Sequence, residues 1–265
     1  MTPIRGIIHF NSGGTAGVNK VQFDKNNVSV LGSGKFVLFS SSRSNRDNNF
    51  TNNIFAINNS NPAIYLTAGT RNFLFINNTY MVDRIAIVLN GSAVTNPNVT
   101  NITFINDTIR VCDFDTVNCN DKNIAADFYL TGNASNIYLQ NVNFNKTRLI
   151  VNSTEDSGAD YNNATVQWFF YLNVTDTSGN AISGATVEVN DSKNSIIWKG
   201  TTNSRGSIDD LMNVTEFEVN GTTAQFYQSC VEAVNEASDA VDNITCYSPL
   251  NISVVKNGYD AFSLT

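Results

Sequence analysis

One short pattern recurs through the first 150 residues and limits the folds that this chain can adopt. The template is Asn-φ-x-φ-x-Asn-x-x-φ, where φ is usually an apolar residue. Copies start at residues 27, 53, 72, 101 and 136, so successive starts lie 26, 19, 29 and 35 residues apart. Apolar and polar residues alternate within each copy, and nothing repeats at helical spacing. The pattern therefore predicts β-strands and sets helices aside for this half of the chain.

A second element precedes three of these copies and ends in glycine. It reads AIYLTAG at residue 63, AIVLNG at 86 and DFYLTG at 127. Repeating units of variable length are typical of the coils of a stacked solenoid, in which each coil buries its apolar residues only against the next. A β-sandwich is the main alternative because its strands also alternate, but it has no reason to repeat asparagine at a fixed offset.

The second asparagine of the template should occupy the same corner of every coil. These residues are Asn58, Asn77, Asn106 and Asn141. We expect their side-chain amides to face the coil interior and to form a hydrogen-bonded asparagine ladder.

The rhythm G-x-x-x-N-I-x-I-x-N-N-x-I, over roughly residues 27 to 151, resembles the right-handed parallel β-helix repeats of secreted carbohydrate-active enzymes and archaeal surface proteins, of the NosD and pectate-lyase type. The resemblance implies an all-β chain with a right-handed parallel β-helix over residues 1–155.

A polar run at residues 152–164, NSTEDSGADYNNA, marks the expected boundary with a second domain at 156–265. Strands are predicted beyond it, with Leu172, Val174, Val187 and Val189 on one face. The run TDTSGNAISGATVEV and the later TTNSRGSI resemble Ig-like and carboxypeptidase-regulatory-like modules, which implies a C-terminal β-sandwich. We expect a short helix within 229–243 and a turn at Lys256, Asn257 and Gly258.

The four cysteines form two close pairs along the chain. Local disulfides are the natural interpretation, linking Cys112 to Cys119 and Cys230 to Cys246. A metal site would need a shorter cysteine spacing or several histidines. The sequence holds only His9, so neither a metal nor a cofactor is expected.

Eighteen sequons of the form Asn-x-Ser/Thr occur in the chain, whereas chance placement predicts roughly 8. The excess indicates N-glycosylation on a secretory route. Asn58, Asn77 and Asn106 should be bare if they are ladder residues. The sequons expected to carry sugar are Asn27, Asn49, Asn90, Asn98, Asn133, Asn145, Asn152, Asn163, Asn173, Asn190, Asn213, Asn220, Asn243 and Asn251.

The charge balance limits the classes of partner. The net charge is −7 and only 15% of residues are charged, so the chain lacks the basic patch that binding to nucleic acid or to an anionic membrane requires. No run of 18 apolar residues and no signal-peptide pattern is present. We therefore expect a mature secreted product or an excised piece of one.

Candidate catalytic residues are sparse. His9 precedes the repeat and is expected to be a strand residue rather than a base. Asp113 and Asp115, Asp83 beside Arg84, and Asp209 with Asp210 could bind Ca²⁺ or a uronic acid, but are expected to be solvated carboxylates. The aromatic run 168–171 could stack on sugars, but is expected at the seam between the domains.

The sequence therefore predicts a glycosylated extracellular, cell-surface module with a structural or adhesive function and no catalytic activity. It would belong to a surface layer, filament or adhesin. Its expected partners are other copies of itself or other surface proteins, N-linked glycans and carbohydrate, but no nucleic acid. The alternative is a secreted β-helix protein that binds or cleaves carbohydrate, which the fold resemblance alone suggests.

Overall fold

The structure is a computed structural model of the 265-residue chain. It describes residues 6–10, 17–31, 36–40, 45–67, 69–91, 98–112, 125–152, 162–208, 212–221, 225–226 and 244–264. Strands dominate this described part of the chain, which contains no α-helix and a single short 3₁₀ helix, η1 (Lys146–Arg148). The expected all-β class is confirmed. Among the described residues, no helix is long and apolar enough to cross a membrane.

Three sheets contain parallel strands. The seven-stranded sheet has the order β1 (Gly6–Phe10), β4 (Phe36–Ser40), β7 (Ile64–Thr67), β10 (Ile85–Asn90), β13 (Ala126–Thr131), β15 (Leu149–Asn152), β20 (Gln225–Phe226). The eight-stranded sheet has the order β2 (Gln22–Asp24), β5 (Asn49–Thr51), β8 (Arg71–Ile76), β11 (Val99–Ile105), β14 (Ala134–Gln140), β16 (Asn162–Phe170), β19 (Met212–Gly221), β21 (Ile244–Cys246). The four-stranded parallel sheet has the order β12 (Thr108–Val111), β9 (Thr79–Val82), β6 (Ile54–Asn58), β3 (Asn27–Leu31).

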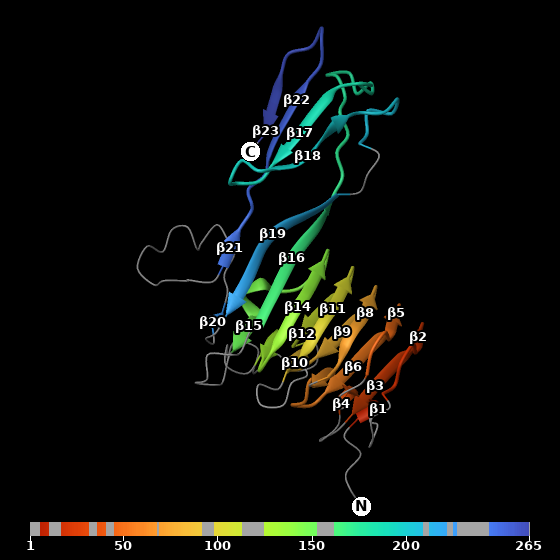
Figure 1. Ribbon diagram of the computed structural model, residues 1–265. Coiled ribbons are helices and arrows are strands. Elements are labelled where there is room, and N and C mark those ends of the chain that lie inside the picture. Colours follow the sequence, from red (N-terminus) through yellow and green to blue (C-terminus); the bar gives the residue numbers. More distant parts are fainter. Residues whose placement is uncertain are drawn as a thin grey trace, which may run out of the picture. The chain divides into compact units, whose positions relative to one another are not determined.

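The chain visits these three sheets in turn. After β5 it passes to β6 and then β7, and it repeats this order through β8, β9 and β10. Each strand therefore lies beside its counterpart from the previous and the next circuit, as Figure 1 shows for β5, β8, β11 and β14. Such parallel pairing in register places equivalent residues of successive circuits directly beside one another.

The in-register pairing builds columns of identical side chains in the core. Phe50 pairs with Phe75, and Phe75 pairs with Phe104. Their rings are stacked, with centroids 4.9 and 4.7 Å apart, and all three side chains are fully buried. Because aromatic pairs at these distances add stabilisation beyond area burial, this column binds each circuit to the next.

The remaining sheet is antiparallel and four-stranded. Its order is β18 (Ile196–Thr201), β17 (Thr186–Asn190), β22 (Asn251–Val255), β23 (Phe262–Leu264). Val187 and Val189 lie in its buried core, and Leu172 and Val174 pack against them. The predicted turn before β23 is confirmed, because Tyr259 N–H donates to the Lys256 carbonyl and Gly258 has a φ of 86°.

The chain divides into two compact units. One comprises Met1–Thr165 and Val219–Asn243, and the other comprises Val166–Glu218 and Ile244–Thr265. The predicted boundary at residues 155 and 156 and the predicted helix at 229–243 both lie outside the described residues. The aromatic run expected at the domain seam starts in β16, within the second of these units.

The glycines that end β10 and β13 allow a close approach of two backbones. Gly132 has a φ of 65°, and a Cβ built on it would lie 2.1 Å from the carbonyl oxygen of Gly91. Gly91 N–H in turn donates to the Thr131 carbonyl at 3.0 Å. Only glycine combines this left-handed backbone with this contact.

We predict that Gly132→Ala lowers the free energy of unfolding by about 2 kcal/mol or more, because the methyl group must displace backbone atoms as well as strain φ. The matched control is Gly179→Ala, where φ is 83° but nothing lies within 4 Å of the added Cβ. Urea denaturation of both variants measures the difference. Equal losses would show that the Gly91 contact does not constrain the fold.

Candidate functional site: asparagine columns along the parallel sheets

Two columns of left-handed residues flank the parallel strands of the eight-stranded sheet. The first corner column lies before β2 and β5 and within the first three residues of β8, β11 and β14, and the second column follows the strands, five residues later in each circuit. Asparagine adopts positive φ more readily than most residues, which explains its repeated use at these corners. The first corner column comprises Lys20, Asp47, Asn72, Asn101 and Asn136; the second comprises Lys25, Asn52, Asn77, Asn106 and Asn141, all with φ between 53° and 60°.

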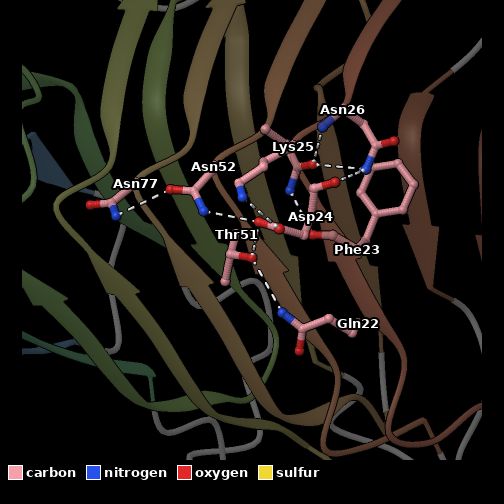
Figure 2. Close-up of polar contacts among 9 residues, drawn as sticks. Gln22, Phe23, Asp24, Lys25, Asn26, Thr51, Asn52 and Asn77 are labelled. Atoms are coloured by element: carbon pink, nitrogen blue, oxygen red, sulfur yellow. Dashed lines mark hydrogen bonds and ion pairs between the residues drawn. The ribbon is translucent and has the colours of Figure 1, made fainter.

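Side chains hydrogen-bond along these columns at the protein surface. Asn77 Nδ2 donates to Asn52 Oδ1 at 3.3 Å, and Asn52 Nδ2 donates to Asp24 Oδ1 at 2.9 Å, as Figure 2 shows. Asn141 Nδ2 donates to Asn106 Oδ1 at 2.7 Å. Bonds between exposed groups contribute little to stability because water competes for both partners.

Asp24 lies at the end of the second corner column. Thr51 Oγ1 donates to its carboxylate at 2.6 Å, and Asn52 donates to the same oxygen. These hydrogen bonds, with a weaker effect of Lys25, hold the pKa of Asp24 below its usual value. The carboxylate is therefore charged at the exposed end of the column.

A second set of polar residues lies one position after the second corner column, and three of the four are buried while Asn26 is half-buried. We name Asn26, Asn53, Asn78 and Asp107 the amide ladder. Asn53 and Asn78 are each 1% exposed and Asp107 is fully buried. Asn26 Nδ2 donates to Asn53 Oδ1 at 3.2 Å, Asn53 Nδ2 to Asn78 Oδ1 at 3.0 Å, and Asn78 Nδ2 to Asp107 Oδ1 at 3.2 Å.

The amide ladder also satisfies the backbone at the corner. Asn53 Oδ1 accepts the backbone N–H of Asn26 at 2.9 Å, and Asn78 Oδ1 accepts that of Asn53 at 2.9 Å. Asn53 Nδ2 donates to the Phe23 carbonyl, and Asn78 Nδ2 donates to the Phe50 carbonyl, both at 2.9 Å. Each central asparagine therefore connects its own circuit to both neighbours and leaves no buried amide unpaired.

Asp107 ends the amide ladder with an ionisable group. Its Oδ1 accepts the Asn78 backbone N–H at 2.6 Å, and its Oδ2 accepts the Tyr80 hydroxyl at 3.0 Å. Burial raises the pKa of Asp107 to about 7, although these hydrogen bonds act in the opposite direction. Burial likewise raises the pKa of Tyr80, so the hydroxyl stays protonated and can donate.

The structure corrects the expected ladder. Asn77, Asn106 and Asn141 do lie in one column, but Asn77 and Asn106 are exposed and Asn141 is half-buried, so the predicted inward orientation is wrong. Asn58 is not in that column. It lies exposed at the end of β6, opposite Leu31 of β3. Burial therefore gives no reason for the sequons at Asn58, Asn77 and Asn106 to lack sugar.

The error arose because two sheets share one sequence pattern. The copies at 27 and 53 form β3 and β6 in the four-stranded parallel sheet, whereas those at 72, 101 and 136 form β8, β11 and β14 in the eight-stranded sheet. The residues that sequence reasoning missed follow the corner asparagines directly. The doublets at 52–53, 77–78 and 106–107 are the signal that could have identified them.

The sequons expected to carry sugar are not deeply buried where the structure describes their side chains. Asn27, Asn145, Asn173 and Asn213 are exposed. Half-buried positions are Asn49, Asn90, Asn98, Asn133, Asn163, Asn190, Asn220 and Asn251. The side chain of Asn152 and the whole of Asn243 lie outside the described part of the chain.

The structure describes only some of the candidate acids and the histidine. Asp113, Asp115, Asp209 and Asp210 lie outside the described residues. Asp83 and Arg84 connect β9 to β10, and His9 lies in β1.

The aromatic run at residues 168–171 takes part in packing of the second unit. Trp168 Nε1 donates to Glu216 at 2.5 Å, and Phe170 packs against the core that contains Val187 and Val189. Tyr171 is 62% exposed, and its hydroxyl lies 2.9 Å from Ser207 Oγ.

The cysteine pairing stays a prediction. Cys112 and Cys246 carry no free thiol. Their expected partners, Cys119 and Cys230, lie outside the residues that the structure describes.

Comparisons of the chain with protein families, with curated proteins and with solved structures find no match. The interpretation of the site therefore depends on its chemistry. Neutral amides neither donate nor accept protons readily at ordinary pH, and Asp107 is closed off from solvent. The amide ladder is suited to holding successive circuits together.

We predict that Asn78→Ala lowers the free energy of unfolding by roughly 2 to 4 kcal/mol, because it leaves the buried backbone N–H of Asn53 without its acceptor and removes the side-chain bonds from Asn78 to the Phe50 carbonyl and to Asp107. The control is Asn77→Gly, which keeps the left-handed backbone at the adjacent exposed position and should cost less than about 1 kcal/mol. Denaturant titrations of both variants test this. A loss at Asn78 no greater than the loss at Asn77 would contradict it.

We further predict that Asp107 makes the chain more stable in acid. The pKa of Asp107 in the folded chain is raised from 3.8 to about 7. Its contribution to the free energy of unfolding is therefore fully present below pH 4 and is lost as the pH rises toward 7. Asp107→Asn keeps the acceptor for Asn78, and the Tyr80 hydroxyl can accept from the new amide. The difference in free energy of unfolding, variant minus wild type, should therefore increase by up to about 4 kcal/mol as the pH rises from 4 to 7.

Asp127 supplies the comparison for this experiment. Burial raises its pKa to about 7 as well, although the Asn145 N–H and Arg148 act against the shift. Asp107→Asn should therefore retain part of the pH dependence of the wild-type free energy of unfolding. The double variant Asp107→Asn/Asp127→Asn should retain less of it. Parallel stability curves for wild type and Asp107→Asn would show that the carboxyl is not desolvated.

Proposed function

We propose that this chain is a glycosylated extracellular building block of a surface layer, filament or adhesin. In this proposal the parallel sheets are the coils of a right-handed parallel β-helix, and the antiparallel sheet belongs to an Ig-like β-sandwich. The regular return of the chain to three sheets supports the first part, and the core around Val187 and Val189 supports the second.

The observation that carries the proposal is the amide ladder. It bonds four successive circuits through side chains of which three are buried and one, Asn26, is half-buried, in addition to the backbone pairing and the stacked phenylalanines. A buried and fully bonded network favours one rigid arrangement over many. Rigidity along a repeated axis is what a subunit under mechanical tension requires, and the amide ladder supplies hydrogen bonds along that axis.

The sequons support the cell-surface location. Their number is more than twice the chance expectation, and the sequon side chains that are exposed include Asn173 and Asn213. Glycans at such positions would surround the subunit without disturbing its core.

Electron microscopy of the material as isolated from its source tests the function. We expect ordered assemblies in which the same contact recurs between copies. A monodisperse protein that degrades acidic polysaccharide, with activity lost in Asp83→Asn, would overturn the proposal in favour of the carbohydrate-active alternative.

Glycopeptide mass spectrometry of the same material tests the location. We predict sugar on Asn173 and Asn213, whose side chains are exposed. The measurement compares the mass of each tryptic peptide before and after enzymatic deglycosylation. Unmodified peptides at both positions would contradict the secretory assignment.

A further inference from the structure

The apolar face of the antiparallel sheet continues to its edge strand without being covered there. Ile252 of β22 pairs with Val189 on one side and with Leu264 on the other. Along this row the exposed fraction rises from 0% at Val189 and 8% at Ile252 to 55% at Leu264. The neighbouring row ends in the same way, because Phe262, opposite Val254, is 57% exposed.

A groove runs beside this edge. It has a volume of about 470 Å³ and lies within the second unit. Leu172, Val174 and Ile182 line it from one side, and Phe262 and Leu264 line it from the sheet. Leu172 and Val174 pack against the core that contains Val187 and Val189, whereas Phe262 and Leu264 of β23 are more than half exposed at the groove.

Exposed apolar side chains concentrate at this place. Three of the seven large hydrophobic side chains that are exposed in the described part of the chain line this groove: Tyr259, Phe262 and Leu264. Among the described strands, β23 pairs with β22 alone. It contains neither the proline nor the charged residue that usually protects an edge strand.

The sequence of β23 is self-complementary. It reads Phe262-Ser263-Leu264, with both apolar side chains on the groove face. If β23 of a second copy approaches antiparallel with Ser263 opposite Ser263, each Phe262 faces Leu264 of the other copy. Aromatic and aliphatic side chains are favourable partners across antiparallel strands.

We propose that β23 pairs with β23 of a second copy of this chain across a two-fold axis at Ser263. The pairing joins two four-stranded sheets into one and inserts Phe262 and Leu264 of each copy beside the groove of the other. Such a contact is isologous, because the same surface serves on both copies. This inference rests on the proposed function, since it names one contact through which the subunits would assemble.

The first test is a crosslink at the axis. Antiparallel partners have Cα atoms within the range that a disulfide spans, so Ser263→Cys should yield a covalent dimer on mild oxidation. Mass spectrometry should find position 263 linked to itself. The control is Ser253→Cys, on the paired strand β22, which should give no dimer. Failure of Ser263→Cys to crosslink at concentrations where the wild type is dimeric would overturn the two-fold register.

The second test measures association of the full chain by sedimentation over a concentration series. Leu264→Lys should raise the dimer dissociation constant at least tenfold, because it places like charges in each other's groove. The matched control is Ile196→Lys, which alters a side chain that is 59% exposed on the opposite edge strand, β18, and should leave the constant unchanged. A wild type that stays monomeric at all concentrations, or equal effects of both variants, would overturn the proposal.

These outcomes separate the inference from the proposed function. If micrographs show ordered assemblies that Leu264→Lys leaves intact, the β23 contact is wrong and the building-block function stands. If the wild type forms β23 dimers but the isolated material shows no further assembly, the contact stands and the building-block function is wrong.

Discussion

The fold depends on satisfying the backbone at one corner of each circuit. A tight corner leaves N–H and C=O groups that neither flanking strand can pair, and burying them unpaired would cost about 1 to 3 kcal/mol each. The side-chain amide of Asn53 pairs such groups in the preceding circuit, because its oxygen accepts the Asn26 N–H and its nitrogen donates to the Phe23 carbonyl. Asn78 repeats the arrangement one circuit later, so the corners stack in a fixed register.

Asp107 stands at the position where this repetition ends. The corresponding residue of the next circuit is Val142, which is buried and whose side chain cannot accept a hydrogen bond. The ladder's last member must therefore satisfy Asn78 and the Tyr80 hydroxyl, and a carboxyl group offers an acceptor oxygen to each. The consequence is a desolvated acid, which explains why its pKa is raised while that of exposed Asp24 is lowered.

The alternation of apolar residues was sufficient to predict the strands at 54–58, 72–76 and 102–105. Alternation could not tell which sheet a strand joins, because the same sequence template forms β6 in the four-stranded parallel sheet and β8 in the eight-stranded sheet. The alternation also placed the inward-facing polar side chain one residue too early, at Asn77 and Asn106 instead of Asn78 and Asp107. The left-handed backbone at Asn77 directs the next side chain, Asn78, into the core. The φ angle of Asn77 cannot be inferred from the sequence of one repeat. The groove beside β23 depends on which strands lack a neighbour, and this information is absent from local sequence.

The claim that buried amides hold the circuits together can be measured directly by NMR exchange of side-chain carboxamide protons. In the folded chain the Nδ2 protons of Asn53 and Asn78 should exchange with solvent only through opening of the structure, at least a hundredfold more slowly than those of Asn52 and Asn77 in the exposed column beside them. Equal exchange rates in the two columns would mean that water reaches the ladder, and the buried amides could then not be what holds successive circuits in register.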